Sequence, residues 1–377
     1  MEVEKSEVKN KTVGEHMKLG IICTMINGFG RRGYYNTQEI GLGRELERQG
    51  HEVTIYKCVK KTGGESIERV KLGNTLSILY IPVSSFGAHG CLDTAVLSTD
   101  LDAVLCFADN QIFLPHIYRF CARHEIRMVP YIGRTHSSSG GVHGFAMNTL
   151  FHLGTLRWFR RGPAISKIEE VRQELLQLGV KDVKVAPVGL DFSVMKSDFA
   201  AYDRAALRRE FGLLPEDMVI CTVGRMGPEK NPLDLVEIYQ QVREQKPCKL
   251  LLVGEGTQSE DLKTKIAASK WKSDIVLIDR IPNDQIWKVY ATADYFVNLC
   301  RTEIFGMAIL EAMYYGVSVA ALAAPGPSVT LRDMPGHKLC SSYEEIRDWL
   351  LAEHPAQEQL RESAARTVQL YNWKPCA

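Results

Sequence analysis

The chain has 377 residues, a length that favours two domains over a single hydrophobic core. Its formal charge of +1, with 24% charged and 45% hydrophobic residues, is that of an ordinary globular protein and gives no reason to expect a nucleic-acid partner. No apolar run is long enough to span a bilayer, and the 10 cysteines include no C-x-x-C pair, which indicates reduced thiols in a cytoplasmic protein.

Strand and helix patterns alternate along most of the chain. Residues 1–16 are polar, and we expect a disordered or expression-derived tail there. The first half then predicts strands at 19–24, 51–56, 76–81, 103–107, 127–132, 163–165 and 183–187, with a helix at 37–49. The second half predicts a helix at 204–211 and strands at 218–223, 249–253, 275–278, 295–299 and 317–322. The pattern predicts an α/β protein of two Rossmann-like, doubly wound domains.

A glycine-rich loop follows the first predicted strand. Its spacing, Gly28-x-Gly30-x-x-Gly33, matches the dinucleotide-binding fingerprint and leaves a nucleotide-binding oxidoreductase that uses NAD as an alternative function. That fingerprint expects an acid at the end of the second strand, where it would hold a ribose. Residues 55–58 contain no acid, so the sequence argues against NAD.

Two carboxylates, Glu303 and Glu311, bracket a turn within residues 302–313. A strand pattern ends just before this stretch, so we expect Glu303 on a strand-to-helix loop and Glu311 about two turns into the helix. The first N–H groups of that helix, beside Gly306, would attract a phosphate, while the carboxylates accept hydrogen bonds from hydroxyls. A phosphate beside two such acids describes a nucleotide sugar. The alternative is a helix N-terminal acid at 303 and a solvated helix residue at 311.

The strand at 218–223 runs into a second glycine loop, which carries the cations Arg225 and Lys230. A departing diphosphate develops negative charge, and Arg and Lys stabilise it when no metal does so. The alternative is an exposed basic loop. Both loops follow strands of the same domain, so we expect them to converge at one edge of the sheet.

The two signals together, Gly-Arg-x4-Lys at 224–230 and Glu-x7-Glu at 303–311, resemble the retaining GT-B glycosyltransferases of family 4, the glycosyl transferases group 1. The resemblance runs from Met17 to the C-terminus. It implies two domains facing each other across a cleft: an acceptor domain at 17–190 and a nucleotide-sugar donor domain at 191–355. It also implies that a C-terminal helix at 356–377 crosses back to the first domain.

The activity implied by the resemblance is transfer of a hexose-type sugar, with retention, from a UDP-linked donor to an acceptor hydroxyl. No cofactor or metal is expected, because the nucleotide sugar is a substrate and cations hold its diphosphate. No residue is placed as a covalent nucleophile, which favours front-face substitution. The implied catalytic residues are His136, Arg225, Lys230 and Glu303. The implied donor-binding residues are Gly30, Gly224, Arg225, Lys230, Ile281, Glu303, Phe305, Gly306, Met307, Ala308 and Glu311.

Some questions stay open at this point. Cys300, Arg301 and the acid-free segment 324–328 depart from the family pattern and leave the donor sugar undecided. The acceptor could be a glycan, a lipid-linked sugar, a protein or a small molecule. Residues 148–161 mix apolar and cationic side chains, which fits either a core helix with a basic edge or a peripheral contact with the inner membrane face. A non-catalytic nucleotide-sugar binder is a further alternative.

Overall fold

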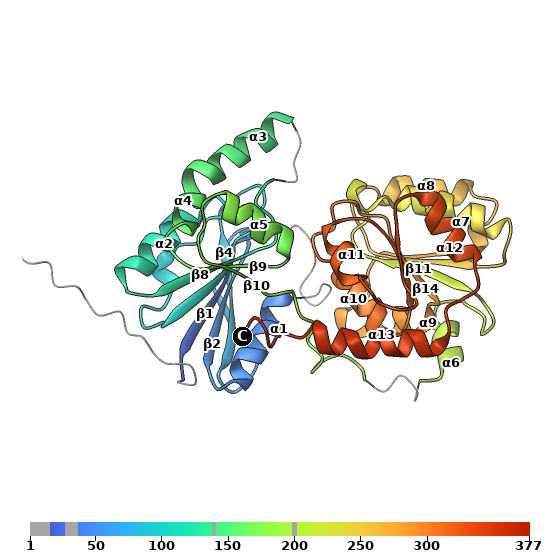
Figure 1. Cartoon of the computed structure of the whole chain (residues 1–377), viewed down its shortest axis with the longest axis horizontal. Helices are drawn as coiled ribbons and strands as arrows, with labels where there is room; N and C mark the ends of the chain where they lie inside the picture. The colour runs from blue at the N-terminus through green and yellow to red at the C-terminus, as the bar shows by residue number, and fades with distance from the viewer. Residues whose placement is uncertain (1–15, 27–36, 138–140, 198–201) are drawn as a thin grey trace, which may run out of the picture. The chain divides into compact units, whose positions relative to one another are not determined.

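The computed structural model of the chain describes residues 16–26, 37–137, 141–197 and 202–377 (Figure 1). The predicted tail up to residue 15 and the loop from Gly28 to Gly33 therefore lie outside the described residues. Two compact units are present. The first comprises Glu39–Pro187 and Trp373–Ala377 together with the first strand, and the second comprises Val188–Asn372.

The first unit is built on an eight-stranded sheet with the order β10-β9-β8-β7-β1-β2-β4-β3. Its strands are parallel except for β3, which pairs antiparallel with β4. The strands are β1 (Lys18–Cys23), β2 (Glu52–Lys60), β3 (Glu68–Lys71), β4 (Leu76–Val83), β7 (Ala103–Phe107), β8 (Arg127–Ile132), β9 (Ala164–Ser166) and β10 (Val183–Val185). A separate hairpin pairs β5 (Ser85–Phe86) with β6 (His89–Gly90).

Five helices of the first unit are described. They are α1 (Gln38–Arg48), α2 (Leu114–Arg123), α3 (Gly141–Leu150), α4 (Leu156–Phe159) and α5 (Glu169–Gln177). A π-helical turn, Phe151–Thr155, joins α3 to α4 without a break. Such turns insert one residue per turn and rotate the faces of a helix on either side of them.

The second unit is built on a six-stranded parallel sheet with the order β13-β12-β11-β14-β15-β16. Its strands are β11 (Val219–Val223), β12 (Lys249–Val253), β13 (Ile275–Ile278), β14 (Tyr295–Asn298), β15 (Ser318–Leu322) and β16 (Lys338–Cys340). Its helices are α6 (Arg204–Glu210), α7 (Pro232–Arg243), α8 (Ser259–Ala268), α9 (Trp287–Thr292), α10 (Met307–Tyr314), α11 (Pro325–Thr330), α12 (Tyr343–Leu351) and α13 (Gln357–Leu370).

Helices cover both faces of this second sheet. α7, α8 and α12 pack together on one face, while α6, α9, α10 and α13 pack on the other (Figure 1). Strands covered on both sides read as continuous apolar runs, and every residue of β14 and β15 is buried. The α/β class with Rossmann-like parallel sheets is therefore confirmed.

Each sheet has a point at which the strand order reverses. In the second unit the chain adds β12 and β13 on one side of β11 and then returns to place β14 on the other side. In the first unit the corresponding neighbours are β1 and β7. Open α/β sheets bind their ligands beyond the carboxyl ends of the strands at such a point. In the second unit this position holds the loops after β11 and β14.

The chain passes between the two units at Pro187–Val188 and again at Asn372–Trp373. The Leu190 amide donates to the Tyr371 carbonyl at 2.7 Å, so the two ends of the second unit lie together. Helix α13 packs against α10 within this second unit. Residues from Trp373 onward belong to the first unit, where the Cys376 thiol lies 3.4 Å from the Pro187 carbonyl oxygen.

One half-buried histidine supports the sheet of the second unit. The Nδ1 atom of His337 accepts a hydrogen bond from the Val319 amide at 3.0 Å, and its Nε2 atom lies 2.6 Å from the Ser363 hydroxyl. A ring nitrogen that accepts a bond carries no proton, so the folded state holds this ring neutral. Burial lowers the pKa of His337 to about 3.

Two further observations bear on the environment of the chain. The 10 cysteines are all free thiols, and most of them are buried in the cores of the two units. Among the described helices, none is both long and apolar enough to cross a bilayer.

Candidate donor-binding site

The loop after β14 carries Glu303 and ends at α10. Asn298, the last residue of β14, organises it: its Oδ1 accepts from the Cys300 amide at 2.9 Å and its Nδ2 donates to Glu303 Oε2 at 3.2 Å. Gly306 precedes α10 with φ at +87°, a conformation that strains residues with a Cβ. Glu303 therefore lies on the strand-to-helix loop that the sequence predicts.

Lys230 and Glu303 form the centre of the site. The Lys230 Nζ atom lies 2.5 Å from Glu303 Oε2, and the two side chains are 29% and 17% exposed. Lys230 ends a 3-10 turn after β11, and the next residue, Asn231, donates from its side chain to the Leu299 carbonyl at 3.0 Å. The two loops on either side of the strand-order reversal are therefore joined by both an ion pair and a hydrogen bond.

The environment of Lys230 favours its charged form. Burial lowers the pKa of its ammonium group, but the nearby Glu303 carboxylate opposes this effect, with smaller contributions from Cys300 and Glu229. The net result is a pKa above the usual range for lysine. The Lys230 side chain thus carries a positive charge at the carboxyl edge of the sheet over the physiological pH range.

The glycine loop after β11 is pressed against the end of β12. Gly224 donates to the Val253 carbonyl at 2.9 Å, and Met226 donates to the Glu255 carbonyl at 3.0 Å. Gly254 has φ at +139°, and a Cβ there would lie 1.7 Å from the Gly224 carbonyl oxygen. Only glycine permits this approach, so the β12 turn fixes the backbone that positions the cations.

Arg225 lies on the same loop but not in the central pair. Its guanidinium is 2.8 Å from the Glu229 carboxylate, and both side chains are more than a third exposed. An exposed pair of this kind contributes little to stability, so an incoming anion can displace Glu229 at small cost. The structure thus places the two predicted cations on one loop and gives them different carboxylate partners.

Glu311 is buried rather than solvated, so the alternative interpretation of this residue is wrong. It lies in the second turn of α10, which begins at Met307, and is 8% exposed. Its Oε2 accepts from the hydroxyl of Tyr290 at 2.7 Å. Tyr290 lies in α9, stacks on Tyr315 with ring centroids 5.7 Å apart, and is 1% exposed. Burial, reinforced by Glu311, raises the pKa of Tyr290 well above its usual range.

The sequence analysis did not identify Tyr290 as part of the site. The sequence feature that could have indicated it is a tyrosine within an apolar run, because the hydroxyl of a buried tyrosine generally needs a hydrogen-bond acceptor. The sequence offers several carboxylates as acceptors, and only the fold shows that Glu311 is the one within reach.

The first turn of α11 supports the Glu303 loop through its backbone. The Gly326 amide donates to the Glu303 carbonyl at 2.8 Å, and a Cβ on Gly326 would lie 2.6 Å from the Phe305 Cα. This close packing accounts for the glycine in the acid-free segment 324–328. A hydrogen bond to the main chain here fixes the turn at Phe305 and Gly306, which lead into the amides of Met307 and Ala308 at the start of α10.

The loop after β13 contains Ile281, which is half-buried. Its neighbour Arg280 forms an ion pair with Glu255, the residue after the β12 turn. Arg301, the unexpected charge near the Glu303 loop, donates to the Ser341 carbonyl at 3.3 Å. The loops after β11, β12, β13 and β14 therefore gather at one edge of the sheet, as their positions in the sequence predict.

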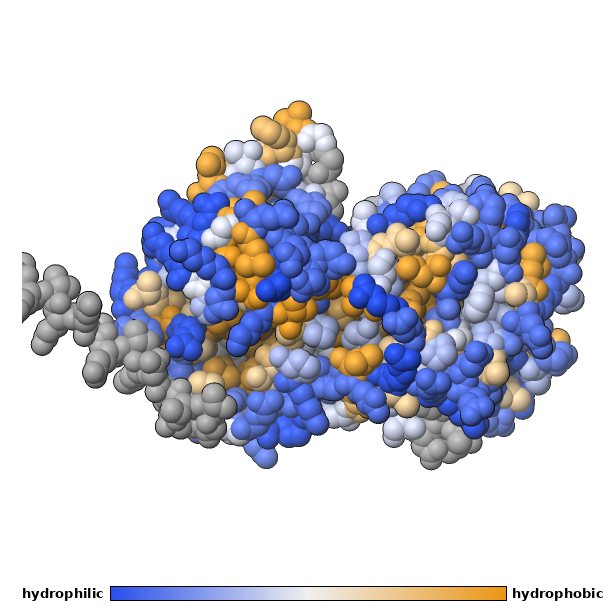
Figure 2. Space-filling view, viewed as in Figure 1, coloured by the Kyte–Doolittle hydropathy of each residue, from blue (hydrophilic) through white to orange (hydrophobic). Residues whose placement is uncertain are grey.

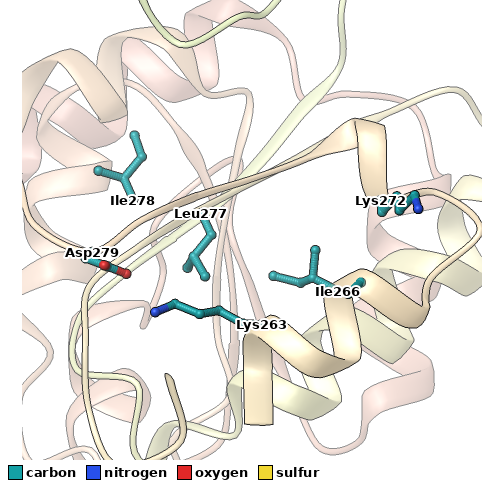
Figure 3. Close-up of a pocket in the computed structure, with 7 residues that line it drawn as sticks. Lys263, Ile266, Lys272, Leu277, Ile278 and Asp279 are labelled. Carbon is teal, nitrogen blue, oxygen red and sulfur yellow. The ribbon is translucent and has the colours of Figure 1, made fainter. Parts of the chain in front are cut away.

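A groove of about 680 Å³ runs beside this region, between α8 and the edge strand β13 (Figure 3). It is lined by Lys263, Ile266, Ala267, Lys272, Leu277, Ile278 and Asp279. In Figure 3 the Lys263 side chain extends toward Asp279, at the carboxyl end of β13. None of the predicted site residues that the structure describes lines this groove.

His136 lies in the first unit, on the loop after β8, and its side chain is exposed. The loop is held by Asn110, whose side chain donates to the Thr135 carbonyl at 3.2 Å. Gly30 lies outside the described residues.

A buried ion pair in the first unit escaped the sequence analysis. Lys167 Nζ lies 2.8 Å from Asp109 Oδ2, with the side chains 7% and 18% exposed. These residues follow β9 and β7, and the ammonium lies 5.2 Å from the ring centre of Tyr131. Single charges far apart in the sequence gave no sign of this pairing.

Comparison with known proteins identifies the second unit. Residues 203–366 match the family described as Glycosyl transferases group 1. The chain carries a group 1 glycosyltransferase domain in a GT-B fold. Arg225, Lys230, Glu303 and Glu311 all lie within the matched residues, whereas His136 and Gly30 lie before them.

Two relatives illustrate the range of similarity. The D-inositol 3-phosphate glycosyltransferase of Segniliparus rotundus is 31% identical over 170 residues, 44% of this chain and 37% of that protein. The alpha-monoglucosyldiacylglycerol synthase of Streptococcus pneumoniae is 23% identical over 299 residues, 75% of this chain and 66% of that protein. The match with this chain thus spans well under half the length of the Segniliparus rotundus relative.

Solved structures share the fold over nearly the whole chain. Sucrose-phosphate synthase from Thermosynechococcus elongatus has a TM-score of 0.71 at 15% identity and covers 95% of this chain and 96% of its own. Anabaena Alr3699/HepE, solved in complex with UDP and glucose, has a TM-score of 0.67 at 15% identity with the same coverage. At this identity the likeness concerns the fold alone.

Proposed function

We propose that the protein transfers a hexose from a UDP-sugar to an acceptor hydroxyl with retention at the anomeric carbon. The observation that carries this proposal is the Lys230–Glu303 pair, which joins the loops after β11 and β14 where the strand order reverses. A cation for phosphate and a carboxylate for hydroxyls are thereby held within one hydrogen bond of each other, beside the N-terminus of α10.

Donor binding would separate the pair. The diphosphate would take the Lys230 ammonium and the first amides of α10, which have no carbonyl partner within the helix. Glu303 would then accept hydrogen bonds from hydroxyls of the donor sugar while Asn298 keeps it oriented. The exposed Arg225 would exchange Glu229 for the outer phosphate oxygens. This exchange of partners would place the positive charges of Lys230 and Arg225 beside the departing diphosphate.

The reaction would proceed on one face of the sugar. The bond between the anomeric carbon and the phosphate oxygen breaks as the acceptor oxygen forms its bond on the same side. The acceptor proton passes to the departing phosphate oxygen. Lys230, Arg225 and the α10 amides stabilise the diphosphate charge, which is the basis for proposing a metal-independent reaction. His136 is proposed to lie near the donor sugar.

The nucleotide would occupy the remaining loops. Glu311, oriented by Tyr290, would accept from the ribose hydroxyls, and the main chain at Ile281 would meet the base. UDP is proposed as the nucleotide because Anabaena Alr3699/HepE, which shares the fold, is solved with UDP and glucose. A glucose-type sugar is also consistent with the Streptococcus pneumoniae relative, named as a monoglucosyldiacylglycerol synthase.

Thermal unfolding with UDP, GDP, ADP and NAD tests the nucleotide. A ligand at about 100 times its dissociation constant stabilises the fold by roughly 2.7 kcal/mol, and we expect this only with UDP. A shift with NAD alone would contradict the proposal and support an oxidoreductase. Once a sugar and an acceptor are found, the anomeric coupling constant of the product by NMR tests retention. Activity unchanged by EDTA tests metal independence.

A further inference from the structure

The helix α3 and the π-helical turn after it expose large apolar side chains to solvent. Val142 is 87% exposed, Phe145 75%, Leu150 51% and Leu153 74%. Figure 2 shows apolar surface along this helix, which extends from the first unit. Apolar residues scattered singly on a surface need no explanation, but a group this dense within one helix marks an interaction site.

The opposite side of the same segment is anchored in the first unit. Met147 is 2% exposed, and Phe151, Leu156 and Phe159 are each 1% exposed or less. Phe151 and Phe159 pack edge to face with ring centres 5.7 Å apart. The buried side chains fix this segment to the first unit, so its opposite side, which carries the exposed apolar residues, faces solvent.

Charge along this part of the chain has one sign. Residues 126–168 contain no Asp or Glu, although they include several arginines. Arg157, Arg160 and Arg161 are exposed and directly follow the apolar side chains. The guanidinium of Arg161 lies 4.5 Å from the ring centre of Trp158, and that of Arg157 lies 5.7 Å away on the same ring. The tryptophan thus holds two cations at the base of the apolar group.

We propose that the exposed side of residues 142–153 binds the surface of an anionic lipid bilayer. The apolar side chains of Phe145 and Leu153 enter the boundary between headgroups and acyl chains. Arg157 of α4 and the two arginines that follow this helix contact the anionic headgroups. Lysine- and arginine-flanked apolar helix faces bind membranes in this orientation. A bilayer is favoured over a protein partner by charge complementarity, because residues 126–168, which include no acid, match a uniformly negative surface.

This inference corrects one interpretation of the sequence. Residues 148–161 are not simply a core helix with a basic edge, since Leu150 and Leu153 face solvent while Phe151 and Leu156 face the core. The π-helical turn lies within this stretch and interrupts the 3.6-residue period, so the solvent-facing and core-facing positions are hard to separate by periodicity alone. The inference is independent of the donor chemistry, because every residue it uses lies in the first unit.

Vesicle flotation of the full chain tests the proposal. We expect the protein to float with vesicles containing about one third phosphatidylglycerol and to stay unbound with phosphatidylcholine alone. Binding should fall steeply in about 0.5 M NaCl, which screens the arginines. A folded chain that does not float with anionic vesicles at low salt would overturn the proposal.

Two pairs of variants separate the apolar and charge contributions. The double variant Phe145→Ser/Leu153→Ser should reduce the vesicle partition coefficient by about tenfold or more. The control Leu214→Ser removes one exposed apolar residue from the second unit and should leave the coefficient unchanged. Arg157→Gln should reduce the partition coefficient about fivefold. Its control, Arg209→Gln on α6 of the second unit, should leave the coefficient unchanged.

Other outcomes are also decisive. Flotation that is equal for the wild type and the Phe145/Leu153 double variant would show that this side does not contact lipid. If a second copy of the chain covers it instead, light scattering will give a dimer that the double variant converts to a monomer, without flotation. UDP-dependent melting, measured on the same variants, reads the proposed donor site separately, so the two proposals can fail independently.

Discussion

Opposite effects on UDP affinity are expected from the two halves of the Lys230–Glu303 pair. Replacing Lys230 with Met removes the ammonium that a diphosphate would bind. A hydrogen bond to a charged group contributes about 1.5–3 kcal/mol, and Lys230 is only 29% exposed, so we expect a loss of about 2 kcal/mol. This corresponds to roughly 30-fold weaker UDP binding.

Glu303→Gln should act in the other direction on the same ligand. UDP lacks the hexose that Glu303 is proposed to contact, but the carboxylate competes with the diphosphate for Lys230, whose ammonium lies 2.5 Å away. A partly exposed pair of this kind contributes about 1 kcal/mol, so its removal should leave UDP affinity unchanged or raise it by up to about fivefold. Transfer from a UDP-sugar should nevertheless fall by about 100-fold or more, because hydroxyl contacts to the sugar are lost.

Isothermal titration calorimetry with UDP on the wild type and both variants measures these effects. Lys265→Met is a matched control, because Lys265 is 26% exposed and also pairs with a glutamate, Glu237, in the same unit. It should bind UDP as the wild type does. If Glu303→Gln weakens UDP binding as much as Lys230→Met, the pair is a structural brace or Glu303 contacts the nucleotide, and the exchange proposed here is refuted.

Three further predictions concern the framework of the second unit. In the unfolded chain the His337 ring binds a proton below about pH 6.5, whereas in the folded protein it stays neutral until about pH 3. The free energy of unfolding should therefore fall by about 1.4 kcal/mol for each unit that the pH drops between these values. Urea unfolding of His337→Asn across this range should show a flatter dependence. Gly254→Ala should destabilise the unit by about 3 kcal/mol or more, since its Cβ would overlap the Gly224 carbonyl; a wild-type melting temperature would contradict this. Tyr290→Phe should cost about 1–3 kcal/mol because it removes the Tyr290 hydrogen bond to the buried Glu311 carboxylate, and calorimetry should show a smaller preference for UDP over 2′-deoxy-UDP.

Much of the fold could be predicted from hydrophobic patterns. The expected strands at 103–107, 127–132, 249–253 and 275–278 match β7, β8, β12 and β13 residue for residue. These strands are apolar and flanked by polar residues, so their limits are visible in the sequence. The antiparallel strand β3 was not predicted, because three of its four residues are exposed and it owes its conformation to pairing with β4. The three-residue β16 was too short to give a pattern.

The candidate site, like the fold, could be predicted from the sequence only in part. Its spacing along the chain could be predicted, because loops after parallel strands must meet at one edge of a sheet. The partners of each side chain could not. Nothing in the sequence pairs Lys230 with Glu303 across 73 residues, or Tyr290 with Glu311, since these contacts depend on strand order and side-chain reach. The packing of Gly326 on Phe305 likewise depends on tertiary structure alone.

The hydrogen bond from Leu190 to Tyr371 gives the second unit a modular character, because it brings the beginning and end of residues 188–372 to one place. A segment whose ends meet can be cut out and replaced without stretching the remainder of the chain. The corresponding units of other proteins with the GT-B fold could therefore be exchanged at Val188 and Asn372 while the first unit is kept constant. Chimeras of this kind would show which properties each unit determines.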